Sequence, residues 1–254
     1  MSTILQRLNR SITTRIRADA SSPPAGPELA KSHFPPIFSW FQTAGHAIND
    51  RGIFVGCPLA LFELTARDPI CLALMEGLKP DSSVLEIGCG CLRVGYWFVQ
   101  FLNAGRYCGV EPNTRMLDAG RELLLGPMEG AKQPRFSHND QFQFGEFQTT
   151  FDYVIAFSIW THAPKIHVAK MLDEFQKVAN PGAKLITTWL SPRPGMPDYQ
   201  GTSWVGRSHQ SDEPGCVAHS QDWIRDAAAS RGLKVDFFEG FVTVQQNWAV
   251  FSCR

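Results

Sequence analysis

The chain has 254 residues, with 24 basic and 24 acidic side chains and therefore a formal net charge of zero. This length suits one domain with additions and is enough to bury a large core. The balanced charge argues against a protein that mainly binds nucleic acid, because such proteins usually carry a basic surplus. The seven cysteines include no zinc-type Cys-x-x-Cys pair and indicate a reducing, cytoplasmic compartment. No apolar stretch approaches the roughly 18 residues that a membrane span needs.

The N-terminal 65 residues are predicted to form an arm and a cap segment ahead of the main domain, residues 66–254. Residues 1–17 carry four arginines and no acid, a composition typical of a short surface helix or, alternatively, of a transit peptide. The proline-rich stretch 20–27 predicts a linker, because proline fixes φ and removes a donor. Residues 34–65 are rich in aromatic side chains without a clear period. We expect them to pack over the sheet edge or over a ligand pocket.

The main domain alternates between strand and helix patterns. Strands are expected at 83–87, 106–111, 135–138, 151–158, 184–190, 233–238 and 247–253. Helices are expected at 67–78, 92–103, 114–125, 165–178 and 220–230. This alternation predicts a doubly wound α/β fold, in which a mostly parallel seven-stranded sheet has helices on both faces. Only eight residues separate the last two strands, too few for a helix, so the last strand is expected to be antiparallel. The longest stretch without a period, 191–219, is expected to be a loop insertion on the substrate side.

One stretch organises the rest of the chain: the apolar run 84–87 passes into a turn with Gly88 and Gly90, and a helical pattern follows. This layout is typical of a nucleotide-binding βα turn, in which glycine lets the backbone approach a ligand that a Cβ would repel. The dinucleotide fingerprint Gly-x-Gly-x-x-Gly is not met, since Arg93 stands at the third glycine position. Glu86 precedes the glycines, and a buried carboxylate there needs a partner such as a cationic ligand or the amides of the turn.

Two further side chains follow predicted strands at places where chemistry is expected. Glu111 ends the second strand, 21 residues after Gly90, where a carboxylate can accept hydrogen bonds from ribose hydroxyls; a surface acid at a strand end is the plainer alternative. His162 follows the fourth strand, and ligands of open α/β sheets bind beyond the carboxyl ends of the strands. Its imidazole titrates near neutral pH and could take a proton from an acceptor hydroxyl. The alternative is a histidine that caps the next helix.

Four segments resemble the motifs of class I S-adenosylmethionine-dependent methyltransferases, namely residues 84–90, 107–113, 151–156 and 178–185. The resemblance covers about residues 81–190, and the expected antiparallel last strand agrees with it. It departs from the family pattern at Leu92, where many members have a third glycine. The first 65 residues and the loop 191–219 match nothing in the family pattern.

The resemblance implies S-adenosyl-L-methionine as the cofactor and S-adenosyl-L-homocysteine as its product. The implied cofactor-binding residues are Glu86, Gly88, Cys89, Gly90, Arg93, Glu111, Pro112, Asn113, Asn139, Asp140, Gln141 and Ser158. Glu86 and the two glycines would shape the methionine side, Glu111 would bind the ribose, and residues 112–113 would lie by the adenine. One of the three residues 139–141 would contact the adenine amino group. Arg93 would pair with Glu86 or meet the cofactor carboxylate.

On the acceptor side, His162 is the predicted catalytic residue, and four side chains are candidates for substrate contacts: Trp160, Thr161, Tyr199 and Trp204. Trp160 could stack on the substrate or approach the sulfonium in a cation–π contact worth roughly 0.5–2 kcal/mol; ordinary packing is the alternative. No metal site is expected, because His162 and His167 are five residues apart and no acidic cluster accompanies them.

The predicted function is transfer of a methyl group from S-adenosyl-L-methionine to a small-molecule acceptor, with O-methylation as the leading reaction, by an enzyme of the EC 2.1.1 type. A cofactor-binding protein of the same fold without transfer activity is one alternative. A nucleotide-dependent oxidoreductase is another, and the missing third glycine disfavours it. The end of the fourth strand lacks the Asn-Pro-Pro-aromatic motif of adenine and glutamine N-methyltransferases and the Pro-Cys pair of cytosine C5 chemistry. We expect no nucleic-acid partner and no membrane span, and no oligomeric state is predicted.

Overall fold

The computed structural model describes residues 39–206, 210–211, 214–238 and 246–253. The chain divides into two compact units, residues 1–35 and 36–254, and every described residue belongs to the second unit. The arm and the linker that the sequence predicts ahead of residue 28 lie outside the described residues. The described part of the predicted cap segment, 39–65, shares its unit with the sheet. The boundary at residue 65 therefore stays a prediction.

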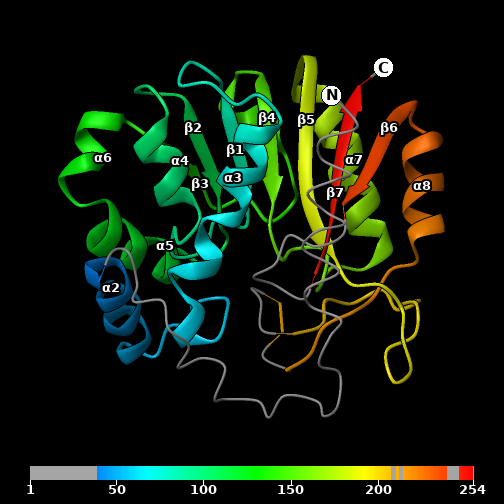
Figure 1. The fold of residues 1–254 in the computed structure, drawn as a ribbon, viewed down its shortest axis with the longest axis horizontal. Coiled ribbons are helices and arrows are strands. Elements are labelled where there is room, and N and C mark those ends of the chain that lie inside the picture. Colours follow the sequence, from blue (N-terminus) through cyan, green and yellow to red (C-terminus); the bar gives the residue numbers. More distant parts are fainter. Residues whose placement is uncertain (1–38, 207–209, 212–213, 239–245, 254) are drawn as a thin grey trace, which may run out of the picture. The chain divides into compact units, whose positions relative to one another are not determined.

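Within the described residues, seven strands form one sheet in the order β3-β2-β1-β4-β5-β7-β6 (Figure 1). The strands are β1 (Val84–Ile87), β2 (Tyr107–Val110), β3 (Arg135–Ser137), β4 (Phe151–Ala156), β5 (Ala179–Trp189), β6 (Leu233–Phe238) and β7 (Asn247–Cys253). Strand β1 pairs in parallel with β2 and β4, and β4 pairs in parallel with β5. Strand β7 runs antiparallel to both β5 and β6. The predicted fold class is confirmed, including the antiparallel last strand.

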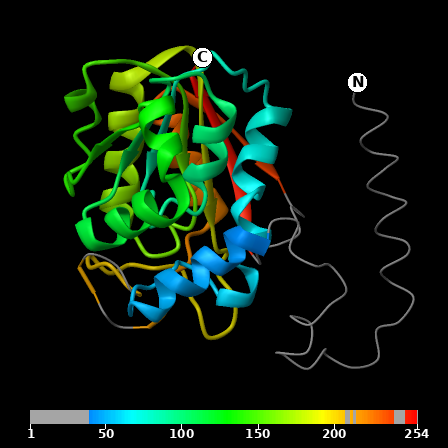
Figure 2. The ribbon, with the colours of Figure 1, turned by 90° about the vertical axis from the view of Figure 1, so that its left-hand side faces the viewer.

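Helices cover both faces of the sheet (Figure 2). Against one face lie α3 (Asp68–Met75), α4 (Gly95–Phe101) and α5 (Thr114–Gly120), which share a buried apolar cluster with alternate strand residues such as Val84 and Ile155. Against the other face lie α7 (Lys165–Val178), α8 (Gln221–Ala229) and the short η5 (Phe144–Phe147), which pack on Leu85 and Val154. Alternate residues of β1 thus enter opposite layers, because successive side chains of a strand point to opposite faces.

The helix α2 (Ser39–Asp50) was not expected in the aromatic-rich cap segment. Its buried residues are Phe41, Ala44, Gly45 and Ile48, which follow the spacing of one helix face. This helical spacing is present in the sequence. It is hard to recognise because Ala44 and Gly45, in the middle of the buried face, are small and the surrounding segment is rich in aromatic residues. Two short 3₁₀ turns, η2 (Leu59–Leu61) and η3 (Leu64–Ala66), complete the cap segment.

Between the helix expected at 114–125 and the third strand lies a further helix that was not expected, α6 (Pro127–Lys132). Proline at the first position suits a helix start, and Gly126 separates α6 from the π-helical turn η4 (Arg121–Leu125) with φ 48°. The Arg121 guanidinium lies 2.7 Å from the Glu129 carboxylate and joins the two elements. Several boundaries also differ from the prediction. For example, α4 begins at Gly95 rather than at residue 92, β4 ends at Ala156 rather than at residue 158, and β5 begins at Ala179 rather than at residue 184.

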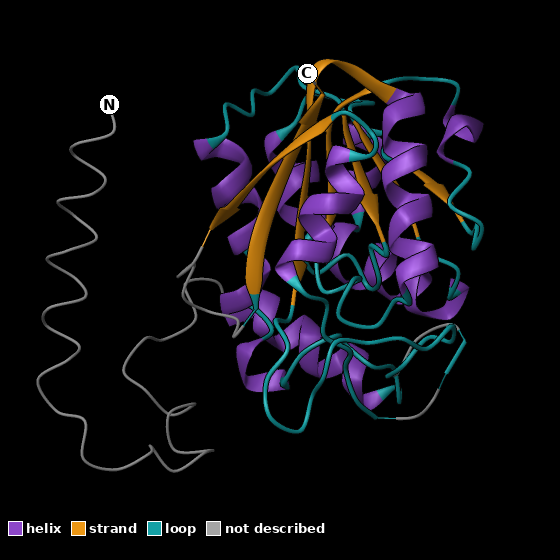
Figure 3. Cartoon of the chain, turned by 90° about the vertical axis from the view of Figure 1, so that its right-hand side faces the viewer, coloured by secondary structure: helices purple, strands orange, loops and turns teal. Residues whose placement is uncertain are grey.

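The cap segment and the described part of the loop 191–219 gather at the carboxyl ends of the parallel strands, the lower end in Figure 1. Figure 3 shows the loop segments on this side of the sheet. Hydrogen bonds connect the loop to the segment after β4: the Val205 amide donates to the His162 carbonyl oxygen at 3.0 Å, and the Val217 amide donates to the Thr161 carbonyl oxygen at 2.8 Å. Among the described helices, none combines the length and the apolar character that a membrane crossing requires.

Candidate functional site

A cavity of about 530 Å³ opens at the carboxyl ends of β1, β2 and β4. This volume lies within the range of roughly 300–1,000 Å³ that is usual for small-molecule sites. Eleven of the twelve residues that the sequence predicts for cofactor binding border it: Glu86, Gly88, Cys89, Gly90, Arg93, Glu111, Pro112, Asn113, Asn139, Asp140 and Ser158. His162 and Trp204, predicted for the acceptor side, border it as well. Their roles are not observed here and stay predictions.

The glycine turn after β1 is held by the end of β2. The amides of Gly88 and Cys89 both donate to the Val110 carbonyl oxygen, at 2.8 and 3.0 Å. Gly88 adopts a φ of 67°, and a Cβ at this position would lie 2.2 Å from the Ile159 side chain. The backbone conformation therefore favours glycine, and the end of the Ile159 side chain would have to shift to admit a Cβ.

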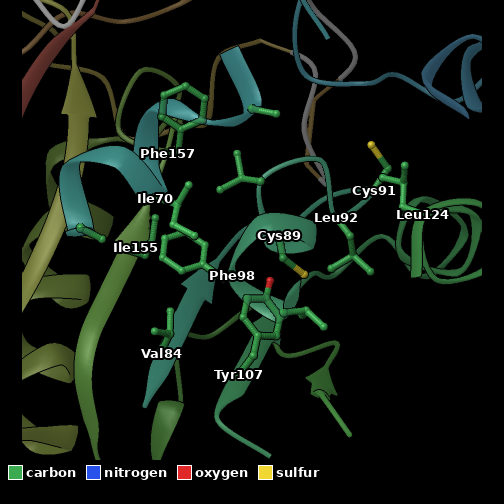
Figure 4. Close-up of a cluster of buried hydrophobic side chains, with 14 of the residues drawn as sticks. Ile70, Val84, Cys89, Cys91, Leu92, Phe98, Tyr107, Leu124, Ile155 and Phe157 are labelled. Carbon is green, nitrogen blue, oxygen red and sulfur yellow. The ribbon is translucent and has the colours of Figure 1, made fainter. Parts of the chain in front are cut away.

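Leu92 replaces the third glycine of the family pattern and yet has a φ of 62°. The left-handed conformation costs a residue with a Cβ roughly 1–2 kcal/mol. The Leu92 side chain is fully buried in the apolar cluster that includes Cys89, Cys91 and Leu124 (Figure 4). Burial of a leucine contributes roughly 1.5–3 kcal/mol, which offsets the backbone strain. The turn thus keeps its shape without the glycine.

Glu111 is anchored by two backbone amides. Its Oε2 accepts from the Gly90 amide at 2.9 Å and its Oε1 accepts from the Asn113 amide at 2.8 Å. Burial raises the pKa of Glu111, and these two hydrogen bonds work against the rise. A carboxylate has about four acceptor positions, so each oxygen can accept one more hydrogen bond from a ligand. This is the arrangement that a diol such as a ribose would use.

Glu86 is buried at the end of β1 and accepts a hydrogen bond of 2.6 Å from the Tyr107 hydroxyl. Burial raises its pKa to about 8, while the Tyr107 hydroxyl and the Arg93 charge work against the rise. Gly95, the first residue of α4, leaves the space for this pair, because a Cβ there would lie 2.3 Å from the Tyr107 oxygen. A cationic group entering the cavity would favour the ionised form of Glu86.

The Arg93 side chain is held by contacts other than Glu86. It forms no ion pair with Glu86; instead one Nη donates to the Thr65 hydroxyl oxygen at 2.5 Å, and the guanidinium lies over the Phe157 ring at 5.5 Å. The side chain is nearly buried and borders the cavity. One of the two predicted alternatives, pairing with Glu86, is therefore wrong.

His162 lies in the segment after β4 with a defined tautomer. Its Nδ1 is 2.8 Å from the Val205 carbonyl oxygen. A carbonyl oxygen only accepts, so Nδ1 carries the proton and Nε2 carries the lone pair of the neutral ring. Burial lowers the pKa of His162, and the hydrogen bonds to the Val205 and Gly215 carbonyl oxygens oppose this only partly. The ring is therefore neutral at neutral pH. The helix cap that the sequence left open is not found, because Pro164 is the N-cap of α7.

Four predicted site residues do not border the cavity. Trp160 is fully buried against the Phe251 ring at 5.4 Å, and Thr161 is fully buried and donates to the Ser158 carbonyl oxygen. The Tyr199 hydroxyl donates to the Ser203 carbonyl oxygen, and Gln141 is exposed beside Asp140. Trp160 and Thr161 are consecutive residues of the turn after β4, and both side chains enter the core instead of the cavity. The enclosure of Trp160 and Thr161 in the core contradicts a substrate contact for these two residues, whereas the assignments of Tyr199 and Gln141 stay predictions.

The opposite wall of the cavity comes from residues that no motif marked. They are mostly apolar and belong to three separate segments: Gly52, Ile53, Phe54, Val55, Gly56, Phe142, Phe157 and Ile159. Trp204 packs on Phe142, with ring centroids 6.4 Å apart and planes 28° from parallel. The aromatic richness of residues 34–65 was the one available signal, since it predicted a segment over the sheet edge or a pocket. The other contacts depend on how distant segments meet.

Comparison with known proteins agrees with this geometry. Residues 85–185 match the family model described as a methyltransferase domain. A sterol 24-C-methyltransferase of Neurospora crassa is 28% identical over 137 residues, which cover 52% of this chain and 34% of that protein, so the match spans about a third of its length.

Two solved structures share the fold. The magnesium protoporphyrin IX methyltransferase of Synechocystis PCC 6803, with bound S-adenosylhomocysteine, aligns with a TM-score of 0.56 at 13% identity over 100% of this chain and 99% of that chain. The amino pentose methyltransferase CalS10 of Micromonospora echinaspora, with bound S-adenosylmethionine, aligns with a TM-score of 0.57 at 17% identity over 88% of this chain and 100% of that chain. At these identities the likeness shows a common fold.

The strand order and the cavity beside the glycine turn define a Rossmann-like α/β fold of the class I type. Residues 85–185 match the family model of a methyltransferase domain, and solved structures with this fold include methyltransferases with bound S-adenosylmethionine or S-adenosylhomocysteine. The family resemblance in the sequence motifs is thereby confirmed, and so, for this class of domain, is S-adenosylmethionine as the cofactor.

Proposed function

We propose that this protein transfers the methyl group of S-adenosylmethionine to a small-molecule acceptor, with a hydroxyl oxygen as the acceptor atom. One observation carries the proposal: a single cavity joins the carboxylate of Glu111, anchored on two backbone amides, to the neutral imidazole of His162. The first suits the ribose of the cofactor, and the second suits the proton of a hydroxyl. The residues present thus fit the cofactor that the domain class uses.

The cofactor would supply an electrophilic methyl group on a sulfonium sulfur. The chain would hold it with Glu111 at the ribose, with Asn139 and Asp140 toward the adenine, and with the turn from Gly88 to Gly90 beneath it. Alignment of the two reactants is the main contribution that such a site can make, and oriented intramolecular reactions suggest up to roughly 7–11 kcal/mol. The apolar wall around Phe54 and Trp204 would exclude water from the reacting atoms.

His162 would be the general base. As the acceptor oxygen forms its bond to the methyl carbon and the carbon–sulfur bond breaks, the hydroxyl proton would pass to the lone pair on His162 Nε2. The Val205 carbonyl oxygen holds the proton on Nδ1 and would stabilise the imidazolium that forms. A positioned base contributes roughly 10²–10⁴ in rate.

A small-molecule acceptor is supported by the cavity volume, by the zero net charge and by the names of the similar proteins, which act on a sterol, a porphyrin and an amino pentose. Transfer to oxygen is supported by His162 alone. The curated relative is named as a methyltransferase to carbon, so the acceptor atom has to be tested on this chain.

Calorimetry with S-adenosylhomocysteine and NAD tests the cofactor. Binding of S-adenosylhomocysteine without a response to NAD is expected, and the reverse result would favour a nucleotide-dependent oxidoreductase. Transfer of a tritiated methyl group to matched phenols, amines and thiols then tests the acceptor atom. Hydroxyl acceptors should be labelled, whereas labelling of amines alone would contradict O-methylation. Binding of S-adenosylhomocysteine without label in any acceptor would favour a binding protein without transfer activity.

A further inference from the structure

The described part of the loop 191–219 contacts His162 at both its backbone and its ring. The Val205 amide donates to the His162 carbonyl oxygen at 3.0 Å, and His162 Nδ1 donates to the Val205 carbonyl oxygen at 2.8 Å. The backbone of His162 is itself fixed in a turn, since its amide donates to the Ile159 carbonyl oxygen at 3.1 Å. The two hydrogen bonds with Val205 therefore place the loop against one edge of the imidazole.

Two further contacts attach the loop to the chain on either side of the histidine. The Val217 amide donates to the Thr161 carbonyl oxygen at 2.8 Å. The Lys165 ammonium, in the first turn of α7, lies 2.5 Å from the Asp198 carboxylate. Because Thr161 and Lys165 flank His162 in the sequence, the position of the loop and the position of the ring depend on each other.

Gly206 follows Val205 and lies against the same edge of the ring. Its φ is 90°, and a Cβ there would lie 2.3 Å from His162 Nδ1, 2.8 Å from His162 Cε1 and 2.4 Å from the Gly215 carbonyl oxygen. Cβ atoms essentially never come within 3.0 Å of another heavy atom, so a side chain at position 206 would displace the imidazole or the loop. Neither Val205 nor Gly206 borders the cavity, whereas His162 does. The loop thus covers the Nδ1–Cε1 edge, and the edge with Nε2 is left for the cavity.

Gly195 belongs to the same loop and has a similar backbone conformation without such a contact. Its φ is 80°, and among the described residues no heavy atom beyond its chain neighbours lies within 4 Å of a Cβ at this position. An alanine should strain the backbone at either glycine, because both have a φ that L side chains rarely adopt. Only at position 206 would the added methyl group also meet the histidine. The two glycines therefore separate backbone strain from contact with the ring.

A neutral imidazole has one N–H and one lone pair, and only the tautomer with the proton on Nδ1 has its lone pair on Nε2. The Val205 carbonyl oxygen favours this tautomer only while the loop lies close to the ring. We propose that Gly206 is a positioning residue for His162: it lets the loop approach the Nδ1 edge of the imidazole, so that the Nε2 lone pair is held for the cavity. The inference rests on the proposed function, in which His162 is the base, and assigns a role to a residue outside the cavity.

Nitrogen NMR of the full chain with labelled histidine tests the inference without an acceptor. At about pH 8 the ring is neutral, and the wild type and Gly195→Ala should both have the His162 proton on Nδ1. In Gly206→Ala the methyl group should displace the ring from the Val205 carbonyl oxygen, so that both tautomers appear. An unchanged tautomer in Gly206→Ala would overturn the inference. If Gly206→Ala does not fold, the wild-type spectrum decides, because a His162 ring that exchanges between tautomers would contradict a fixed position.

Kinetics with the phenols of the acceptor test then measure the consequence. Gly206→Ala should lower kcat by about tenfold or more, since a misplacement of about 1 Å can cost roughly 10² in rate, and should leave S-adenosylhomocysteine affinity within about twofold. Gly195→Ala should keep the wild-type kcat.

A double variant shows whether Gly206 acts through the histidine. Added to His162→Ala, the Gly206→Ala substitution should lower kcat no further, because both changes remove the same interaction. Additive losses, or an equal loss of S-adenosylhomocysteine affinity in Gly206→Ala, would mean that Gly206 only supports the structure and would overturn the inference. An unchanged kcat in His162→Ala contradicts the proposed function instead, and the tautomer in Gly206→Ala still decides whether Gly206 positions the ring.

Discussion

The two walls of the cavity are constructed differently. The wall formed by the ends of β1 and β2 consists of backbone amides and carboxylates, and its hydrogen bonds join residues of two consecutive βα units, as between Gly90 and Glu111. The facing wall consists of side chains from residues 52–56, from Phe142 and from Trp204, which meet only in the folded chain. Backbone amides can bind a ligand that is common to many proteins, because they do not depend on side-chain identity. The apolar side chains of the facing wall can change in size and shape without altering those backbone amides. We therefore expect changes in the first wall to affect the cofactor and changes in the second to affect the acceptor.

The largest expected effect is at His162, which borders the same cavity. His162→Ala should lower kcat by roughly 10²–10⁴ with a hydroxyl acceptor, because the proton loses its positioned base, while S-adenosylhomocysteine affinity should change little. The wild-type kcat should also fall in acid, where the imidazole of His162 is protonated. The kcat of His162→Ala should not show this dependence on pH. Steady-state kinetics with isothermal calorimetry measures both quantities. His46→Ala, an exposed histidine away from the cavity, is the control, and an unchanged kcat in His162→Ala would remove the base assignment.

Glu86, which belongs to the first wall, should make the free energy of unfolding of the protein depend on pH. Because burial raises its pKa from 4.5 to about 8, the folded protein holds the proton to higher pH than the unfolded chain does. The contribution of Glu86 to stability is therefore complete below about pH 4.5 and is lost as the pH rises through 8. At 1.36 kcal/mol per unit, the loss between pH 5 and pH 8 is roughly 3 kcal/mol.

Urea unfolding of Glu86→Gln at several pH values measures this difference. The variant keeps an acceptor for the Tyr107 hydroxyl and has no charge to bury, so its free energy of unfolding should gain on the wild type by roughly 3 kcal/mol between pH 5 and pH 8. The exposed Glu146→Gln should follow the wild-type curve. Parallel curves for Glu86→Gln and the wild type would show that the Glu86 carboxyl titrates normally.

The affinity for S-adenosylhomocysteine tests the role of Glu111 in the first wall. Glu111→Ala should weaken S-adenosylhomocysteine binding by about tenfold or more, since charge-assisted hydrogen bonds contribute about 1.5–3 kcal/mol and the Gly90 and Asn113 amides also lose their acceptor. Calorimetry measures the change, with Glu146→Ala as a surface control. If Glu111→Ala binds S-adenosylhomocysteine as tightly as the wild type does, the assignment of Glu111 to the ribose is wrong.

The smallest expected effect is on the facing wall. Phe54 is about as exposed as Leu64, each at 39%, but only Phe54 borders the cavity. Phe54→Ala removes apolar contact area worth about 1 kcal/mol, so the KM for the acceptor should rise by about fivefold while S-adenosylhomocysteine affinity stays within about twofold. Leu64→Ala is the matched control and should change neither. If Phe54→Ala weakens both ligands equally, the two walls do not act separately.

Much of the first wall could be predicted from short segments. An apolar run precedes Gly88, a helical pattern follows it, and the acid Glu111 stands at the end of the next strand. Many α/β proteins share this order of strand, turn and helix. The same reasoning predicted the antiparallel last strand, since eight residues cannot form a crossover helix. It was less successful for α2 and α6, where small residues or a single proline obscure a short period.

The sequence by itself determined the sheet, the turn and the acids at the ends of β1 and β2, because these depend on periodicity and on hydrogen bonds between neighbouring segments. Only the tertiary structure decided which side chains face the cavity. Trp160 and His162 are two residues apart, yet one is enclosed in the core and the other borders the cavity. Thr65 meets Arg93 across 28 residues, and Trp204 meets Phe142 across a longer stretch. Such contacts follow from the packing of distant segments, and no local pattern in the sequence contains that information.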